Sequence, residues 1–239
     1  MNLRLKLFKN ISFVIFSLCS FSIEAKLFPK NFHSEYQLLQ KSNNLGRVIV
    51  DFNKNNNKYE IKAITKSEGI LRLIGDREVI SKGKLSIDGF SPQIFKLKNK
   101  KKPKKNILAV FDSKDKRVKL TYKEETKSIL LKEKHLDVLS YLYQFNFESL
   151  NKKKYIFEIV DGKKSRTYLY KKIRQEFIET GVGNLEADVY EGEIKGKNNS
   201  KHFLWILREP YRVPLKIKIK TDIGIDISQV LVKTNLIID

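Results

Sequence analysis

The side chains that could carry out chemistry are few, and the carboxylates come closest to forming a pattern. Glu176, Glu179 and Glu186 lie on predicted strands around a glycine-containing turn, residues 181–183. Because a strand rather than a helix follows, the glycines indicate a turn and not a phosphate-binding loop. Two carboxylates about 5 to 10 Å apart in an open cleft are what a glycosidase needs. One hypothesis is therefore a hydrolase or transferase that acts on a cell-wall or lipid substrate through carboxylates.

The other reactive side chains indicate no further chemistry. His33, His135 and His202 lack the spacing of metal ligands, so we predict no metal site and no cofactor, and we interpret all three as surface or capping residues. Ser140 has no glycine elbow around it. Asp137, three residues earlier, is better explained as a helix N-cap than as the partner of a nucleophile. These residues favour a protein that is not an enzyme.

The first 25 residues have the pattern of an export signal. Basic residues precede the apolar run ISFVIFSLCSFSI, and IEA offers a small-residue cleavage site between Ala25 and Lys26. The apolar run is short for a bilayer span, which needs about 20 residues, although an uncleaved anchor is the alternative. Cys19, the only cysteine, would leave with the signal. We therefore predict a periplasmic protein, with residues 26–239 forming a single β-rich domain without disulfides.

The chain is strongly basic, with 48 Lys and Arg against 27 Asp and Glu. Removing the predicted signal takes away three basic residues and one acidic residue, which leaves 45 − 26, or +19. Such a charge is typical of proteins that bind nucleic acid, anionic membranes or acidic polymers. In PLKIKIKT, however, lysines alternate with apolar residues, as on an ordinary solvated sheet face. Because export removes most access to nucleic acid, the predicted partners are lipid, an anionic envelope surface or another envelope protein.

The densest basic stretch is KLKNKKKPKK, residues 96–105, with seven lysines in ten positions. It lies between the apolar runs QIF and ILAVF, which we expect to form a hairpin with a basic loop at residues 98–105. Lys100, Lys101 and Lys102 are predicted to contact anions such as lipid phosphates, with about 1 kcal/mol from each lysine. No aromatic residues alternate with these lysines, which argues against a nucleic-acid surface.

A second basic feature is the segment REPYRVP, in which Arg208 and Arg212 lie around two prolines. The segment is interpreted either as a rigid corner between strands or as a corner where two arginine side chains grip a phosphate or carboxylate. Trp205, the only tryptophan, is expected in the core.

Most of the mature chain consists of short runs with alternating apolar and polar residues, separated by turn residues. Examples are RVIVDF, YEIKAIT, KRVKLTY, RTYLY, RQEFIET and PLKIKIKT. We predict a mainly β fold, in which one curved antiparallel sheet or open barrel of about ten to twelve strands wraps a short apolar helix.

The segment HLDVLSYLYQFNF, residues 135–147, is the exception, because it fits both an aromatic strand and an apolar helix. Asp137 as a possible N-cap and the leucine content favour the helix. A helix that is apolar around most of its circumference must be enclosed by other structure. Leu139, Leu142, Tyr143 and Phe145 are therefore the predicted contacts for an apolar ligand, if the sheet leaves a cavity around them.

Five stretches resemble a family of exported bacterial proteins, the domain of unknown function 3108. They are GILRLIG, SKGKLSIDGFSPQIFKLKNKKKPKKNILAVFD, LDVLSYLYQF, TGVGNLEADVYE and WILREPYRVPLKIKIKTDIGIDISQVLV. The resemblance implies a periplasmic, β-rich protein with a basic loop, and it implies no activity. A likeness in shape to half-barrel lipoprotein carriers of the envelope is an analogy of fold only.

Taken together, the sequence favours a non-catalytic envelope protein that binds an apolar or lipid-like ligand or docks on another envelope component. A cavity beside the helix would favour a carrier of an apolar ligand. A tightly filled interior would favour a protein that docks on another envelope component. The sequence leaves the oligomeric state open.

Overall fold

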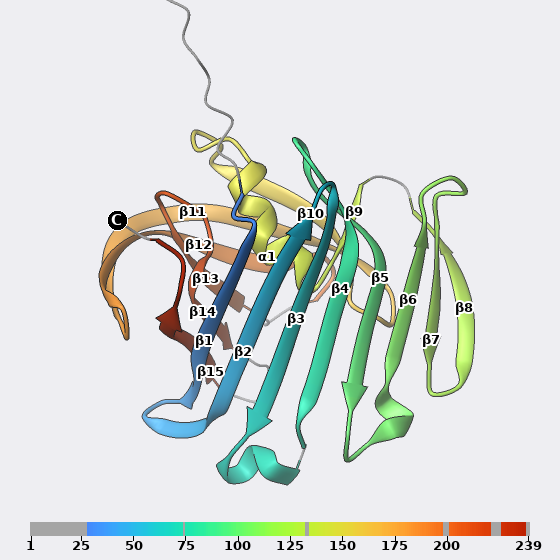
Figure 1. Cartoon of the computed structure of the whole chain (residues 1–239), viewed down its shortest axis with the longest axis horizontal. Helices are drawn as coiled ribbons and strands as arrows, with labels where there is room; N and C mark the ends of the chain where they lie inside the picture. Colours follow the sequence, from blue (N-terminus) through green and yellow to red (C-terminus); the bar gives the residue numbers. More distant parts are fainter. Residues whose placement is uncertain (1–27, 74, 132–133, 198–200, 221–225, 238–239) are drawn as a thin grey trace, which may run out of the picture.

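The computed structural model describes residues 28–237 except residues 74, 132–133, 198–200 and 221–225. The predicted signal, with its cleavage site at Ala25 and Lys26 and with Cys19, lies outside the described residues. The described chain has fifteen strands, the short helix α1 (Ser140–Gln144) and three 3-10 turns, η1 (Gly69–Leu73), η2 (Pro103–Lys105) and η3 (Phe145–Phe147) (Figure 1). The strands are β1 (Asn31–Gln40), β2 (Asn43–Asn55), β3 (Lys58–Ser67), β4 (Arg77–Ser86), β5 (Gly89–Asn99), β6 (Ile107–Asp112), β7 (Arg117–Tyr122), β8 (Glu125–Leu130), β9 (His135–Asp137), β10 (Lys154–Val160), β11 (Ser165–Thr180), β12 (Gly183–Ile194), β13 (Lys201–Leu207), β14 (Pro214–Lys220) and β15 (Asp226–Thr234).

All fifteen strands belong to one open sheet, in the order β8-β7-β6-β5-β4-β3-β2-β1-β15-β14-β13-β12-β11-β10-β9. Neighbouring strands are antiparallel except β9, which pairs parallel to β10. The mainly β, antiparallel prediction is confirmed, but the expected number of strands is too low. Strands β8 and β9 were not expected, and the two runs RTYLY and RQEFIET form the single strand β11.

The strands follow the alternation of apolar and polar residues. In β1, Phe32, Tyr36 and Leu38 are buried on one face, and residues between them are partly exposed. The tight turn between β2 and β3 places Asn56 at φ 52°, a left-handed conformation that asparagine tolerates better than most residues. The local sequence thus determines both the faces of the strands and where they turn.

The sheet curls because its register shifts at several places. Five of the strand pairs contain such a shift, including those after Glu35, Leu38 and Lys82. A bulge of this kind bends the strand and increases its twist. The result is two layers, with β1–β8 in front and β10–β14 behind, and α1 lies between them (Figure 1). The predicted curved sheet around a short helix is what the structure has.

Candidate functional site

Helix α1 and turn η3 form a short helical plug in the concave side of the sheet. The helix prediction is confirmed over residues 140–147, although the α-helix itself has only five residues. Asp137 lies two residues before the helix cap, and its Oδ1 accepts hydrogen bonds from the N–H groups of Leu139 and Ser140, both at 2.9 Å. In return, Ser140 Oγ accepts from the Asp137 N–H at 3.0 Å, the reciprocal pattern of a capping box. The N-cap residue of α1 is Leu139, so the prediction of Asp137 as the N-cap is wrong in position, although the Asp137 side chain does bond two N–H groups at the start of the plug.

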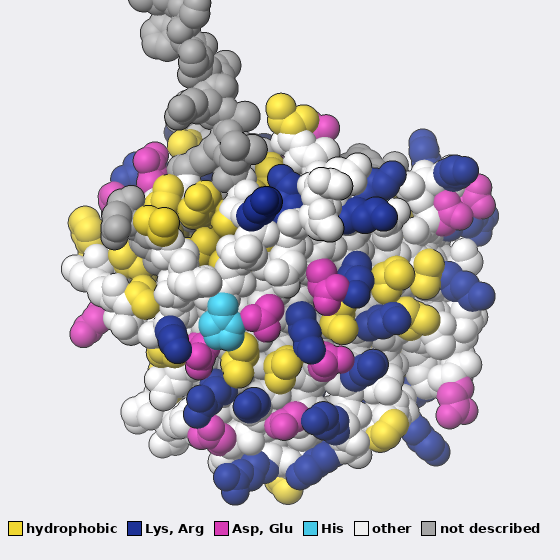
Figure 2. Space-filling view, in the orientation of Figure 1, with side chains coloured by type: hydrophobic (Ala, Val, Ile, Leu, Met, Phe, Trp, Pro, Cys, Tyr) yellow, Lys and Arg dark blue, Asp and Glu magenta, His cyan; other side chains and the backbone are white. Residues whose placement is uncertain are grey.

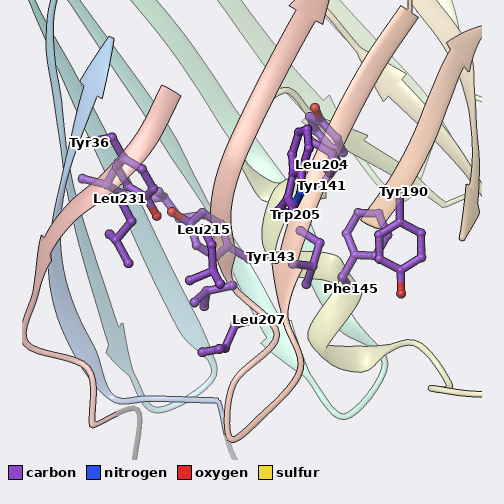
Figure 3. Close-up of a cluster of buried hydrophobic side chains, with 14 of the residues drawn as sticks. Tyr36, Tyr141, Tyr143, Phe145, Tyr190, Leu204, Trp205, Leu207, Leu215 and Leu231 are labelled. Carbon is purple, nitrogen blue, oxygen red and sulfur yellow. The ribbon is translucent and has the colours of Figure 1, made fainter. Parts of the chain in front are cut away.

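The residues predicted to bind an apolar ligand pack against protein side chains. Phe145 is fully buried, with its ring centroid 5.2 Å from that of Tyr155 and 5.0 Å from that of Tyr190. Tyr143 is also buried and lies 5.5 Å from the ring of Phe32. Figure 3 shows Tyr143, Phe145 and Tyr190 among the strands around the helix. Leu139 and Leu142 are partly buried against the same core.

None of the four pockets that we describe in the structured part of the chain is lined by Leu139, Leu142, Tyr143 or Phe145. The largest of the four, of about 510 Å³, lies on the outer face of the sheet. Its walls include Ile156 and Leu169, which alternate with the inward-facing Tyr155 and Tyr170. The aromatic side chains of the plug are therefore in contact with other side chains of the core.

A buried carboxylate attaches the plug to the front layer. Asp137 Oδ2 accepts a hydrogen bond of 2.5 Å from Ser81 Oγ on β4, and Ser81 Oγ lies 2.9 Å from the hydroxyl of Tyr59 on β3. Burial raises the pKa of Asp137 above its ordinary value, while its hydrogen bonds with Ser81 and the helix N–H groups act in the opposite direction.

A buried amide attaches the plug to the turn between β4 and β5. Gln144 Oε1 accepts from the N–H of Phe90 at 2.9 Å, and its Nε2 donates to the Asp88 carbonyl at 3.1 Å. Gly89, between these two residues, has φ +94°, and a Cβ there would lie 2.3 Å from Gln144 Oε1. Only glycine fits both the backbone and this close approach.

We expect Gly89→Ala to destabilise the protein more than Gly183→Ala. Both residues have positive φ, so both substitutions cost about 1–3 kcal/mol in backbone strain. Nothing lies within 4 Å of a Cβ at Gly183, whereas a Cβ at Gly89 displaces the Gln144 amide. Losing those buried hydrogen bonds costs about 1–3 kcal/mol more. Urea unfolding of the two variants measures the difference, and equal losses would contradict the proposed contact.

The back layer holds the plug through Arg212, which is only 2% exposed. Its Nη1 donates to the carbonyls of Phe145 at 2.7 Å and Glu148 at 3.1 Å, and its Nη2 donates to the Tyr190 hydroxyl. The buried carboxylate of Asp188 lies 3.8 Å from Nη2. The guanidinium is thus directed into the core.

Arg208, the other predicted anion contact in this segment, is more exposed. Its Nη1 is 2.7 Å from Glu186 Oε1, and its Nε is 3.6 Å from Asp188 Oδ1. The two arginine side chains therefore lie in different environments. Arg208 forms an ion pair near the surface, and Arg212 is buried. Their segment lies between β13 and β14, as a corner between strands.

Two of the three candidate catalytic carboxylates, Glu176 and Glu186, form ion pairs. Glu176 pairs with Arg174 at 2.7 Å and accepts a hydrogen bond from the Trp205 indole. The hydrogen bond with Arg174, followed by that with Trp205, lowers the pKa of Glu176. Glu186 pairs with Arg208, and Glu179 is exposed. Residues 181–182 form the turn between β11 and β12, as expected.

The histidines do not come together. His33 on β1 pairs with Asp51 at 2.7 Å, and this hydrogen bond raises the pKa of His33. His135 on β9 is buried, with its Nε2 3.1 Å from Ser165 Oγ, so its interpretation as a surface residue is wrong. His202 lies 5.8 Å from the ring of Tyr168, and burial lowers its pKa. Within the described ranges, no group of three or more His, Cys, Asp or Glu residues could hold a metal ion.

The predicted basic loop lies at one end of the sheet, beside η1. Lys100, Lys101 and Lys102 are exposed in the connection between the paired strands β5 and β6. Lys101 Nζ donates to the Arg72 carbonyl at 2.7 Å, which joins this loop to η1. Leu73, at the end of η1, is 74% exposed, and sequence reasoning did not identify it. We call Arg72, Leu73 and residues 100–105 the basic rim.

The two 3-10 turns that contribute to the basic rim, η1 and η2, lie at the lower end of the front layer in Figure 1. Figure 2, in the same orientation, shows many Lys and Arg side chains over this face, including its lower end. The basic rim is therefore an exposed leucine beside a cluster of lysines.

No helix within the described residues is long and apolar enough to cross a membrane.

These features define a mainly β protein in which a curled sheet encloses a helical plug and carries a basic rim at one end. The chain belongs to the family described as "Protein of unknown function (DUF3108)", whose model matches residues 35–231. The resemblance found in the sequence is thereby confirmed. No curated protein matches the sequence.

Three solved structures show distant similarity. A predicted lipoprotein of Parabacteroides distasonis is 10% identical, with 87% of this chain and 97% of that chain covered and a TM-score of 0.37. A predicted exported protein of Bacteroides fragilis with a YmcC-like fold is 8% identical, with the same coverage and a TM-score of 0.35. The lipoprotein LppX of Mycobacterium tuberculosis is 12% identical over 91% of this chain and 94% of that chain, with a TM-score of 0.24. These values are too low to support an argument about function.

Proposed function

We propose that this protein is a non-catalytic component of the bacterial envelope, located in the periplasm, which docks through its basic rim on an anionic lipid surface. The observation that supports this most directly is the position of Leu73 beside the lysines of the β5–β6 loop. An apolar side chain flanked by lysines can enter the interfacial region while the ammonium groups contact lipid phosphates. The export signal predicted from the sequence supports the compartment.

The packed interior supports docking over carrying a ligand. Phe145 and Tyr143 are surrounded by other aromatic rings, and Asp137, Gln144 and Arg212 attach the plug to three parts of the sheet. A carrier would need room beside the plug for an apolar chain. The function proposed here therefore uses the outer surface.

The carboxylates give little support to the alternative of a hydrolase or transferase. A general acid needs a raised pKa, whereas the pKa of Glu176 is lowered by its partners. Asp137 has a raised pKa, but its carboxylate is completely buried and forms part of the helix cap.

The proposal is tested by changing Lys100, Lys102, Lys104 and Lys105 together to glutamine, while Lys101 is kept because it joins the two turns. At about 1 kcal/mol for each lysine, binding to vesicles of phosphatidylglycerol and phosphatidylethanolamine should weaken at least tenfold, with about a thousandfold as the upper limit. Vesicle sedimentation at fixed salt concentration measures the change.

The matched control changes four lysines at the opposite end of the sheet, Lys54, Lys58, Lys84 and Lys114, to glutamine. It removes the same charge, so a non-specific charge effect would weaken binding equally in both variants, which would refute the proposed rim. Leu73→Ser tests the apolar part. It should weaken binding without changing the dependence on salt concentration, because it removes no charge.

A further inference from the structure

Strand β8 is one end of the sheet, and its outer side has no neighbouring strand within the described residues. It pairs with β7 alone, and Figure 1 shows it at the right-hand margin of the sheet. The turn between β7 and β8 consists of Lys123 and Glu124, both with positive φ, so Tyr122 and Glu125 face each other. This is the geometry of a two-residue hairpin.

The hairpin determines which backbone groups of β8 face outward. In an antiparallel ladder, alternate residues bond to the neighbouring strand, beginning with the pair beside the turn. Glu125, Lys127 and Ile129 are therefore bonded to β7, and the bond from the Leu131 N–H to the Lys116 carbonyl at 2.7 Å continues this alternation. The N–H and C=O groups of Thr126 and Ser128 then point to the open side, together with those of Leu130.

Two of the usual features that prevent pairing, a proline and a bulge, are absent from β8, although Glu125 and Lys127 place charges on its inner face. Edge strands are commonly protected by proline, a bulge or charged side chains. Strand β8, ETKSIL, contains no proline, and its register with β7 is uninterrupted. The outer-face residues Thr126 and Ser128 are small and exposed, and Leu130 is 60% exposed. The outward N–H and C=O groups of β8 are therefore available for pairing with an added strand.

A groove beside β8 indicates which side chains an added strand would carry. It has a volume of about 310 Å³ and lies between the inner face of β7–β8 and the turn after β10. Leu120 and Tyr122 contribute apolar surface. Two lysines, Lys127 and Lys163, outnumber the one carboxylate of the lining, Glu125, so the net charge of the groove is positive. Lys163 Nζ lies 4.8 Å from the centre of the Tyr122 ring. An apolar or aromatic side chain flanked by carboxylates would suit this groove.

The positive charge of this chain favours an acidic partner over a second copy of the same chain. A second copy of this chain would bring another formal charge of +21, so repulsion between the two copies would oppose their pairing. We propose that β8 binds an extended, acidic segment of a partner protein, which adds to the sheet as a sixteenth strand. This surface is independent of the basic rim.

The test uses a nine-residue synthetic peptide in which glutamate alternates with valine and tyrosine. Binding is measured by fluorescence anisotropy, and hydrogen exchange reports protection of the amides in residues 125–131. Ser128→Pro removes an outward N–H but leaves the ladder with β7 intact, so peptide binding should weaken at least tenfold with unchanged thermal unfolding. Ser128→Ala keeps the N–H and should bind as the original chain does.

Three results would overturn the proposal. The first is a Ser128→Pro variant that binds the peptide normally. The second is equal binding of a peptide with lysine in place of glutamate, or of one whose alternate backbone amides are methylated. The third is a dimer of the peptide-free protein that Ser128→Pro abolishes, because it would make a second copy the occupant of this edge.

Discussion

Replacing Arg212 with alanine is expected to lower the free energy of unfolding by about 3–5 kcal/mol, the usual cost of breaking a buried ion pair. The guanidinium is buried and donates to two backbone carbonyls at the end of the plug. Its loss leaves these carbonyls without that donor and removes one positive charge from beside buried Asp188, which Lys172 also contacts at 2.7 Å. The melting temperature should fall on the order of 10 °C for a chain of this size.

Arg208→Ala is the matched control, because it removes an arginine from the same segment. Arg208 pairs with Glu186 near the surface, and both side chains are more than a third exposed. Such pairs contribute about 0–1 kcal/mol. Urea unfolding of both variants gives the comparison. If Arg212→Ala were no more destabilising than Arg208→Ala, the proposed attachment of the plug to the back layer would be wrong.

The predicted parts of the fold are those that depend on local sequence. KRVKLTY forms β7, with Val118 and Leu120 buried as their alternation indicates. The capping by Asp137 involves only residues up to Ser140, so it too could be inferred from neighbours in the chain. The α-helix is shorter than the predicted segment 135–147 because the segment begins with β9 and ends with η3.

The missed strands lack a usable pattern for physical reasons. Strand β8 is almost wholly exposed because it is an edge, so its residues show no apolar alternation. Strand β9 is buried at all three of its positions, and three residues are too few to show a period. In β11, the register shift between Lys172 and Arg174 changes which face each residue occupies. One bent strand therefore resembled two separate ones.

The roles of the arginines could not be predicted, because they depend on contacts distant in sequence. Arg212 Nη1 bonds the carbonyl of Phe145, 67 residues away, and Arg208 bonds Glu186, 22 residues away. Nothing in REPYRVP distinguishes the buried arginine from the exposed one. Leu73 was missed for a similar reason, since its position beside the basic loop depends on the pairing of β4 with β5.

Asp137 should make the stability of the protein depend on pH in the direction opposite to that of a typical paired carboxylate. Burial raises its pKa in the folded chain, whereas in the unfolded chain the pKa is about 3.9. Between these two values the folded state binds more protons, so its contribution is greatest below about pH 4 and is lost as the pH rises through the folded pKa. At neutral pH this carboxyl group therefore contributes less stability than it does at pH 4, a loss that a side chain without an ionisable proton would avoid.

Asp137→Asn and Asp137→Ala separate this charge from the hydrogen bonds. Asparagine keeps an oxygen for the N–H groups of Leu139 and Ser140, and its amide can donate to Ser81, whose hydroxyl then turns to Tyr59. Alanine keeps none of these bonds and should cost about 2–4 kcal/mol at neutral pH, from the lost cap and the unsatisfied buried groups.

The measurement is urea unfolding of the original chain and both variants at pH 4 and pH 7. Other ionisable groups affect all three proteins alike, so the informative quantity is the stability of Asp137→Asn minus that of the original chain. The gain in stability from asparagine should be larger at pH 7 than at pH 4, because aspartate can lose a proton between these two pH values and asparagine cannot. An unchanged or reversed difference would mean that Asp137 has a normal or lowered pKa. Its contacts with Ser81 and the helix N–H groups would then outweigh the effect of burial.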